Sequence, residues 1–91
     1  MIRSLIPRVT FRGTLADGAD GRSIDRLAAL SASTPPRGVV LLAEVEGEPV
    51  AAIGLFDGQT VSDRARSTFA ALMRLHLLRL QVRTIVALRG L

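Results

Sequence analysis

A chain of 91 residues is the length of one domain, and 48% hydrophobic and 22% charged residues are ordinary for a globular protein, which argues against disorder. The absence of cysteine excludes a disulfide framework, thiolate zinc sites and thiol catalysis, and it fits a reducing, cytoplasmic location. The formal charge is +4, and every basic residue is arginine. This is typical of a GC-rich bacterial coding sequence, so we do not interpret the charge as evidence for nucleic acid.

The two ends of the sequence argue against membrane targeting. The start, MIRSLIPRVTF, has no apolar run long enough for a signal peptide. The C-terminal apolar stretch, FAALMRLHLLRLQVRTIVALRGL, is interrupted by four arginines and a histidine. A central arginine costs about 2.5–3.5 kcal/mol in a spanning helix. We therefore expect a soluble protein, or one that at most lies on a membrane surface.

The first third of the chain predicts a strand, a turn and a helix. Residues 7–14 alternate apolar and polar side chains, which favours a strand with one solvated face. The Gly- and Asp-rich run LADGADGRS predicts a turn, and residues 21–31 carry apolar side chains at helical spacing. Asp20 or Ser23 could cap this helix. Pro35 and Pro36 then end it.

The middle of the chain predicts a three-stranded β-meander. Residues 38–46 and 50–56 are apolar and rich in β-branched side chains, with a tight turn at Gly47 between them. The dipeptide Asp57-Gly58 is a second hairpin signal, and residues 59–62 follow as a short strand.

A long helix is predicted at the C-terminal end, beginning after a cap at Ser67 or Thr68 and running at least through Leu80. Residues 81–91 are ambiguous because their β-branched side chains also suit a strand, but no turn dipeptide separates them from the helix, so helix is favoured. The chain is therefore predicted to be one α+β domain over residues 1–91, with a tail at 1–6. An antiparallel meander carries one helix between its first and second strands and a long helix at its end.

Two segments resemble the opening of the GNAT acyltransferase fold. The first is VTFRGTLADGADGRSIDRLAAL, in which Phe11-Arg12 ends a strand, Asp17 or Asp20 lies in the turn, and Ile24 and Leu27 form a helical stripe. The second is GVVLLAEVEGEPVAAIGLFDG, which resembles the second and third GNAT strands. The resemblance spans residues 8–80 and extends to small actinobacterial GNAT-like proteins with a leucine- and arginine-rich terminal helix.

The resemblance also implies what an acyltransferase would need. In GNAT enzymes, a loop of the form Arg/Gln-x-x-Gly-x-Gly/Ala binds the acyl-CoA pyrophosphate at a helix N-terminus, and many members use a tyrosine as general acid. No such pattern follows Phe56, Gly58 stands alone, and the chain has no tyrosine. We therefore expect a truncated GNAT-like domain with no catalytic residue and no cofactor. The alternative is an N-acyltransferase that uses acetyl-CoA at a site completed by dimerisation.

Other candidate sites are weak. The glycines at 13, 18 and 21 lack the lysine and the spacing of a phosphate loop, so a turn is the simpler interpretation. His76 has no carboxylate nearby in the sequence to suit catalysis or metal binding. Five acidic residues could form a carboxylate pair or a metal cluster: Glu44, Glu46, Glu48, Asp57 and Asp63. Acidic residues are equally expected on the solvated face of a hairpin.

The C-terminal helix offers two candidate surfaces. One is a basic face that would meet phosphates of nucleic acid or an anionic membrane, formed by Arg74, Arg79 and Arg83. With only three aromatic residues in the chain, base stacking is poor, so nucleic acid is disfavoured. The other is an apolar contact surface formed by Phe69, Leu72, Met73, Leu77 and Leu80. The sequence thus predicts a non-catalytic module that forms homo-oligomers or binds a protein partner, through this helix and the open edge of the meander.

Overall fold

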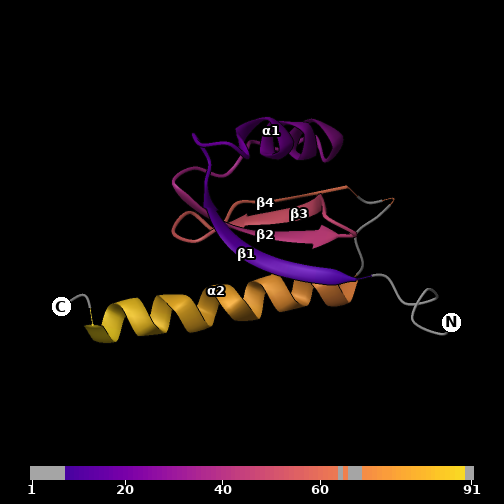
Figure 1. The fold of residues 1–91 in the computed structure, drawn as a ribbon. Helices are drawn as coiled ribbons and strands as arrows, with labels where there is room; N and C mark the ends of the chain where they lie inside the picture. Colours follow the sequence, from indigo (N-terminus) through magenta and orange to yellow (C-terminus); the bar gives the residue numbers. More distant parts are fainter. Residues whose placement is uncertain (1–7, 64, 66–68, 90–91) are drawn as a thin grey trace, which may run out of the picture.

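The computed structural model describes residues 8–63, 65 and 69–89, without the side chain of Phe69. The elements follow the order β1 (Val9–Leu15), α1 (Gly21–Leu30), β2 (Val39–Val45), β3 (Glu48–Gly54), β4 (Thr60–Ser62) and α2 (Phe69–Arg89) (Figure 1). The predicted α+β class, with one helix between the first two strands and a long helix at the end, is confirmed. The proposed caps Ser67 and Thr68 and the tail at 1–6 lie outside the described residues.

The sheet is wholly antiparallel, with the strands in the order β1-β2-β3-β4. The first predicted strand joins the three central ones in this sheet, because β1 pairs along its full length with β2, from Val9 opposite Val45 to Leu15 opposite Val39. The β2–β3 turn has positive φ at both Glu46 and Gly47, as a type I′ hairpin requires. Glu46 is held in this conformation because its backbone N–H and its carboxylate both bind Arg8.

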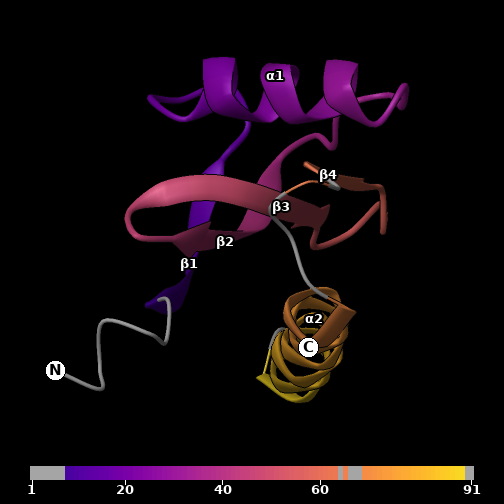
Figure 2. The same ribbon diagram turned by 90° about the vertical axis from the view of Figure 1, so that its right-hand side faces the viewer.

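One helix covers each face of the sheet, so the domain has three layers (Figure 2). On the α1 face, Ile24 and Leu27 pack against buried side chains of all three meander strands, among them Val40, Ala52 and Val61. The α2 face has its own core, in which Leu75 packs with four buried strand residues, Ala43, Val50, Ala51 and Ile53.

Asp20 at the start of α1 directs its side chain to β1 and not to the helix. Asp20 is the N-cap residue, but its side chain makes no capping hydrogen bond. Its carboxylate instead binds the Arg12 guanidinium and the Thr14 hydroxyl on β1. Bonds to a charged guanidinium are stronger than bonds to a neutral backbone N–H, so the carboxylate turns towards the strand. Of the two predicted caps, Asp20 therefore occupies the N-cap position and Ser23 does not, but Asp20 does not cap the helix through its side chain.

Helix α2 continues to Arg89, so the helical interpretation of residues 81–89 is confirmed and the strand alternative is wrong. It packs on the sheet through Ala71 and Leu75, with Leu72 half-buried beside them. Residues 83–89 are exposed, and this part of the helix projects past the end of the sheet (Figure 1). Among the described residues, no helix is both long enough and apolar enough to span a membrane.

Candidate protein-interaction surface

The side of α2 that faces away from the sheet carries an apolar seam. Its members recur at alternating intervals of three and four residues, which is the heptad spacing of coiled-coil contacts. We call this set the outer seam: Ala70, Met73, Leu77, Leu80, Thr84 and Ala87. The three large side chains of the seam are half-exposed, at 45% for Met73, 52% for Leu77 and 58% for Leu80. With 3.6 residues per turn, the seam lies opposite Leu75, which is fully buried against the sheet.

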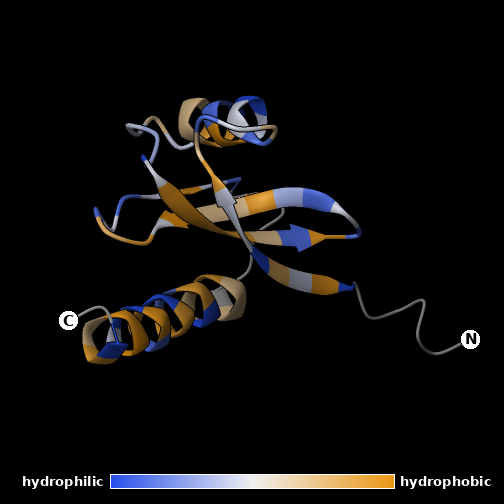
Figure 3. Cartoon of the chain, turned by 60° about the vertical axis from the view of Figure 1, so that its left-hand side comes forward, coloured by the Kyte–Doolittle hydropathy of each residue, from blue (hydrophilic) through white to orange (hydrophobic). Residues whose placement is uncertain are grey.

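The seam exists because the sequence of α2 is apolar on nearly every side. A helix that lies on a protein surface normally separates its apolar and polar residues onto opposite faces. In α2, hydrophobic residues recur all round the axis between the arginines (Figure 3). Only one stripe can contact the sheet, so the remaining apolar side chains are left uncovered by the described part of the chain. Exposed apolar patches of this kind mark contact surfaces.

A hollow lies beside the C-terminal half of the seam. It is framed by Leu80, Gln81, Thr84 and Ile85 and has a volume of about 460 Å³. Thr84 donates its hydroxyl to the backbone oxygen of Leu80 at 2.8 Å, so its polar atom is already satisfied within the helix. The short Thr84 side chain between larger neighbours therefore leaves an opening suited to an apolar side chain from another molecule.

The arginines of α2 do not share one face. Arg74 and Arg83 are exposed and flank the outer seam on opposite sides. Arg79 is partly buried and turns towards the sheet, where its Nε donates to the backbone oxygens of Gly54 at 3.1 Å and Leu55 at 3.0 Å. Of the three residues proposed as a basic face, Arg79 thus anchors the end of β3, and the other two lie beside the seam.

All of the formal net charge of the chain belongs to α2. Four of the twelve arginines and none of the eight acidic residues lie in this helix, so the other eight arginines balance the acids elsewhere. A surface that approaches the outer seam therefore meets no acidic residue of α2, which favours an acidic partner surface.

On the same face of the sheet, β1 is only partly covered by α2. Odd-numbered side chains of β1 point to the α2 face, where Val9 is 41% and Leu15 is 54% exposed and Phe11 is half-buried. A hollow of about 450 Å³ separates β1 from the helix and is lined by Val9, Phe11, Ala70, Ala71 and Arg74. The apolar surface of β1 and the outer seam therefore lie on the same side of the molecule.

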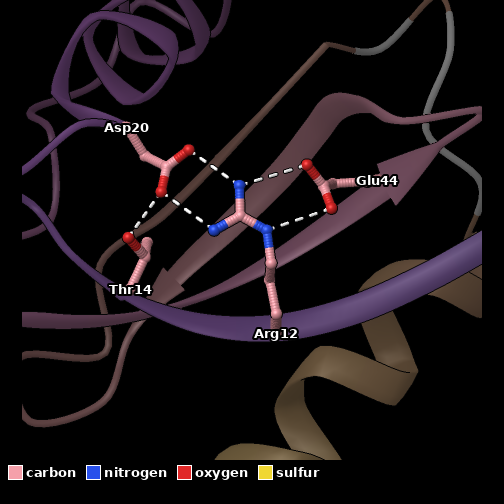
Figure 4. A network of polar contacts seen from close by, with 4 residues as sticks. All are labelled: Arg12, Thr14, Asp20 and Glu44. Carbon is pink, nitrogen blue, oxygen red and sulfur yellow. Dashed lines mark hydrogen bonds and ion pairs between the residues drawn. The ribbon is translucent and has the colours of Figure 1, made fainter.

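The opposite face of β1 is polar and closed by a network of ionic bonds (Figure 4). The Arg12 guanidinium donates to both carboxylate oxygens of Asp20, at 2.9 and 2.7 Å, and to both of Glu44, at 3.1 and 3.2 Å. Thr14 donates to Asp20 at 2.6 Å. Hydrogen bonds from Arg12 and then Thr14 lower the pKa of Asp20 to about 2, and the two carboxylates raise the pKa of Arg12. Each charged group in the network has a partner of opposite sign, and the network holds β1 to the start of α1 and to β2.

The remaining candidate residues have structural placements. Gly13 lies in β1, whereas Gly18 and Gly21 form the turn that starts α1. His76 is exposed on α2. Within the described part of the chain, no group of three His, Cys, Asp or Glu side chains could hold a metal ion.

The proposed acidic cluster is dispersed. Asp57 accepts hydrogen bonds from the backbone N–H groups of Arg37 and Gln59, and Asp63 lies 4.0 Å from Arg26. Glu44 binds Arg12 and Glu46 binds Arg8. Each of these four carboxylates therefore has partners of its own, and no two of them share a site.

Of the five proposed contact residues, Met73, Leu77 and Leu80 are on the outer seam. Leu72 packs against the α2-face core, and the side chain of Phe69 lies outside the described residues. Sequence reasoning missed Thr84 and Ile85 because it weighed helical periodicity only up to Leu80. A search for heptad spacing through the end of the helix would have found Thr84.

Comparison of this chain with protein-family models, with curated proteins and with solved structures gives no match. The resemblance to GNAT acyltransferases stays a prediction.

Proposed function

We propose that this chain is a GNAT-like, non-catalytic domain that acts as a protein-interaction module, and that it docks another polypeptide on the outer seam of α2. One observation carries the proposal. Met73, Leu77 and Leu80 form a half-exposed apolar line at heptad spacing, on the side of the helix opposite its packed stripe. Helices use this spacing to contact other helices.

The chemistry of the occupant follows from the seam and its flanks. Fully burying three half-exposed side chains contributes on the order of 3 kcal/mol, whereas association costs about 4–15 kcal/mol. The partner must therefore supply apolar side chains of its own, including one for the hollow at Thr84. Arg74 and Arg83 on the flanks favour acidic residues beside those apolar positions. An amphipathic helix with acidic edges meets both requirements.

A library of displayed helical peptides tests the proposal without knowledge of the natural partner. We expect selected peptides to carry apolar residues at heptad spacing and acidic residues beside them. Their binding should weaken at least about ten-fold in Leu77→Glu, because a carboxylate then faces the apolar seam. Leu30→Glu is the matched control, since Leu30 on α1 is 55% exposed and Leu77 is 52% exposed. Peptides that bind both variants equally would contradict the proposal.

The concentration of positive charge on α2 also favours a second candidate, a helix that lies on an anionic membrane surface. Vesicles of phosphatidylserine and phosphatidylcholine distinguish the two. Membrane binding would fall steeply with added salt because it depends on the arginines. Docking of an amphipathic helix would retain most of its strength in salt, because apolar contacts carry it.

A further inference from the structure

The outer edge of β1 carries a row of free backbone groups. Arg8 accepts a bond from Glu46 N–H at 2.9 Å, and Ala16 donates to the Gly38 oxygen at 2.8 Å. In an antiparallel pair, successive residues point alternately towards and away from the partner strand. The even-numbered residues of β1 therefore bind β2, and Val9, Phe11 and Gly13 direct N–H and C=O outward. Among the described residues, β1 is an edge strand with no neighbour on this side.

This edge lacks the features that usually protect an exposed strand. Proline, lysine or an inward-pointing charge commonly blocks pairing with other chains. From Val9 to Leu15, the only charged residue is Arg12, and its guanidinium is already held by Asp20 and Glu44. The side chains on the α2 face are apolar, and a Cβ placed on Gly13 would meet no atom within 4 Å.

We propose that β1 pairs antiparallel with β1 of a second copy, in a register centred on Phe11, and that this joins the two sheets into one continuous sheet. Phe11 then lies opposite Phe11 of the second copy. Val9 of each copy lies opposite Gly13 of the other. Each of these outward-pointing pairs exchanges two N–H···O=C bonds. The two phenyl rings meet on the α2 face, where aromatic pairs across strands are favourable.

Charge selects this register over its neighbours. On the α1 face, centring on Phe11 places Arg12 opposite Thr10 of the second copy. A shift that centres the pairing on Thr10 would place Arg8 opposite Arg12, and a shift that centres it on Arg12 would place two copies of Arg12 face to face. Like charges directly opposite one another destabilise a strand pair. Of these three registers, only the one centred on Phe11 keeps the arginines of the two copies from lying opposite one another.

The same argument explains why the second copy pairs at β1 and not at the outer seam. Two seams face to face would bring Arg74 and Arg83 of both copies together without any acidic residue. In the β1 pairing, both α2 helices lie on one face of the joined sheet and are separated by the two β1 strands. Each outer seam stays accessible. The inference therefore goes beyond the proposed function and does not depend on it.

Sedimentation velocity over a range of concentrations tests the pairing with two variants of one residue. Gly13→Pro removes an outward N–H and leaves every β1–β2 bond in place, since Gly13 does not point towards β2. We expect its dimer dissociation constant to rise at least about 30-fold, because two interchain bonds are lost. Gly13→Ala keeps the N–H and should dimerise like the unaltered chain. A monomeric unaltered chain at millimolar concentration would overturn the inference. So would a folded Gly13→Pro that dimerises normally, or a dimer that Leu77→Glu abolishes.

Disulfide trapping tests the register and does not rely on proline. The chain has no cysteine, so Val9→Cys and Gly13→Cys can be made separately and mixed under mild oxidation. Opposite residues in a bonded pair have Cα atoms about 5.5 Å apart, within the range that a disulfide spans. We expect the mixed disulfide to exceed either homodisulfide several-fold. Equal yields, or no mixed product, would overturn the Phe11-centred pairing.

Discussion

Helices α1 and α2 cover opposite faces of one sheet, yet they relate to solvent in different ways. In α1, Ile24, Leu27 and Ala28 are buried, and the outward positions are mostly charged or small. In α2, Leu75 is just as deeply buried, but Leu77, only two residues later, is half-exposed on the outer seam. The α1 face is a finished surface, whereas the α2 face keeps apolar side chains available for contact. The proposed function rests on this difference between the two faces.

The largest expected effect separates the two sides of α2. Leu75→Ala should lower the free energy of unfolding by about 2–5 kcal/mol, because it leaves a cavity in the α2-face core. Leu77→Ala should change it by no more than about 0.5 kcal/mol, because the side chain already faces solvent. Urea unfolding of both variants measures the difference. Equal losses would mean that Leu77 is packed within the domain and that the seam is not free.

A second comparison sets Arg79 against Arg83, one turn apart on α2. Arg79→Met keeps an apolar stem but removes the Nε donor from the Gly54 and Leu55 oxygens, so the free energy of unfolding should fall by about 1–2 kcal/mol. Arg83→Met serves as the control and should be neutral within about 0.5 kcal/mol, since Arg83 is exposed. Thermal unfolding distinguishes the variants. If Arg79→Met left the free energy of unfolding unchanged, the end of β3 would need no anchor from this side chain.

The network on the α1 face predicts a dependence of stability on acid. The pKa of Asp20 is lowered to about 2 in the folded chain, against about 3.9 for an unfolded aspartate. A lowered folded pKa stabilises the protein above the unfolded value, and this contribution is lost as pH falls from about 5 towards 2. Solvent screening at this surface limits the loss to about 1 kcal/mol. Chemical denaturation between pH 6 and 2 measures the free energy of unfolding of the unaltered chain and of Asp20→Asn. Over this range, the variant should lose about 1 kcal/mol less than the unaltered chain. Parallel profiles for the two proteins would contradict the assignment.

The smallest expected effect concerns the acyltransferase alternative. Acetyl-CoA at millimolar concentration should leave the amide chemical shifts of the chain unchanged. Saturable shifts at micromolar ligand, clustered at one end of a strand, would support an acyl-CoA site and weaken the case for a non-catalytic module.

Local sequence signals were sufficient for the fold but not for the sites. Alternation in β1, the prolines after α1 and the hairpin at Gly47 each depend on neighbouring residues, so the elements could be predicted in order. The contacts of Asp20 could not be predicted, because its partners Arg12 and Thr14 lie on a strand whose place in the sheet the sequence does not give. The side of α2 that packs on the sheet could not be predicted either. In a helix that is apolar on most sides, only the position of the sheet decides that Leu75 is buried and Leu77 is not.

The most direct test of the account is photo-crosslinking in the cells that produce this protein. A benzoylphenylalanine placed at Leu77 is compared with one placed at Leu30, two residues of similar exposure on opposite faces of the sheet. We expect discrete protein adducts at position 77 that the selected acidic peptide suppresses, and few or none at position 30. Equal labelling at both positions, or adducts at 77 that the peptide leaves unchanged, would contradict the claim that the outer seam of α2 is the contact surface.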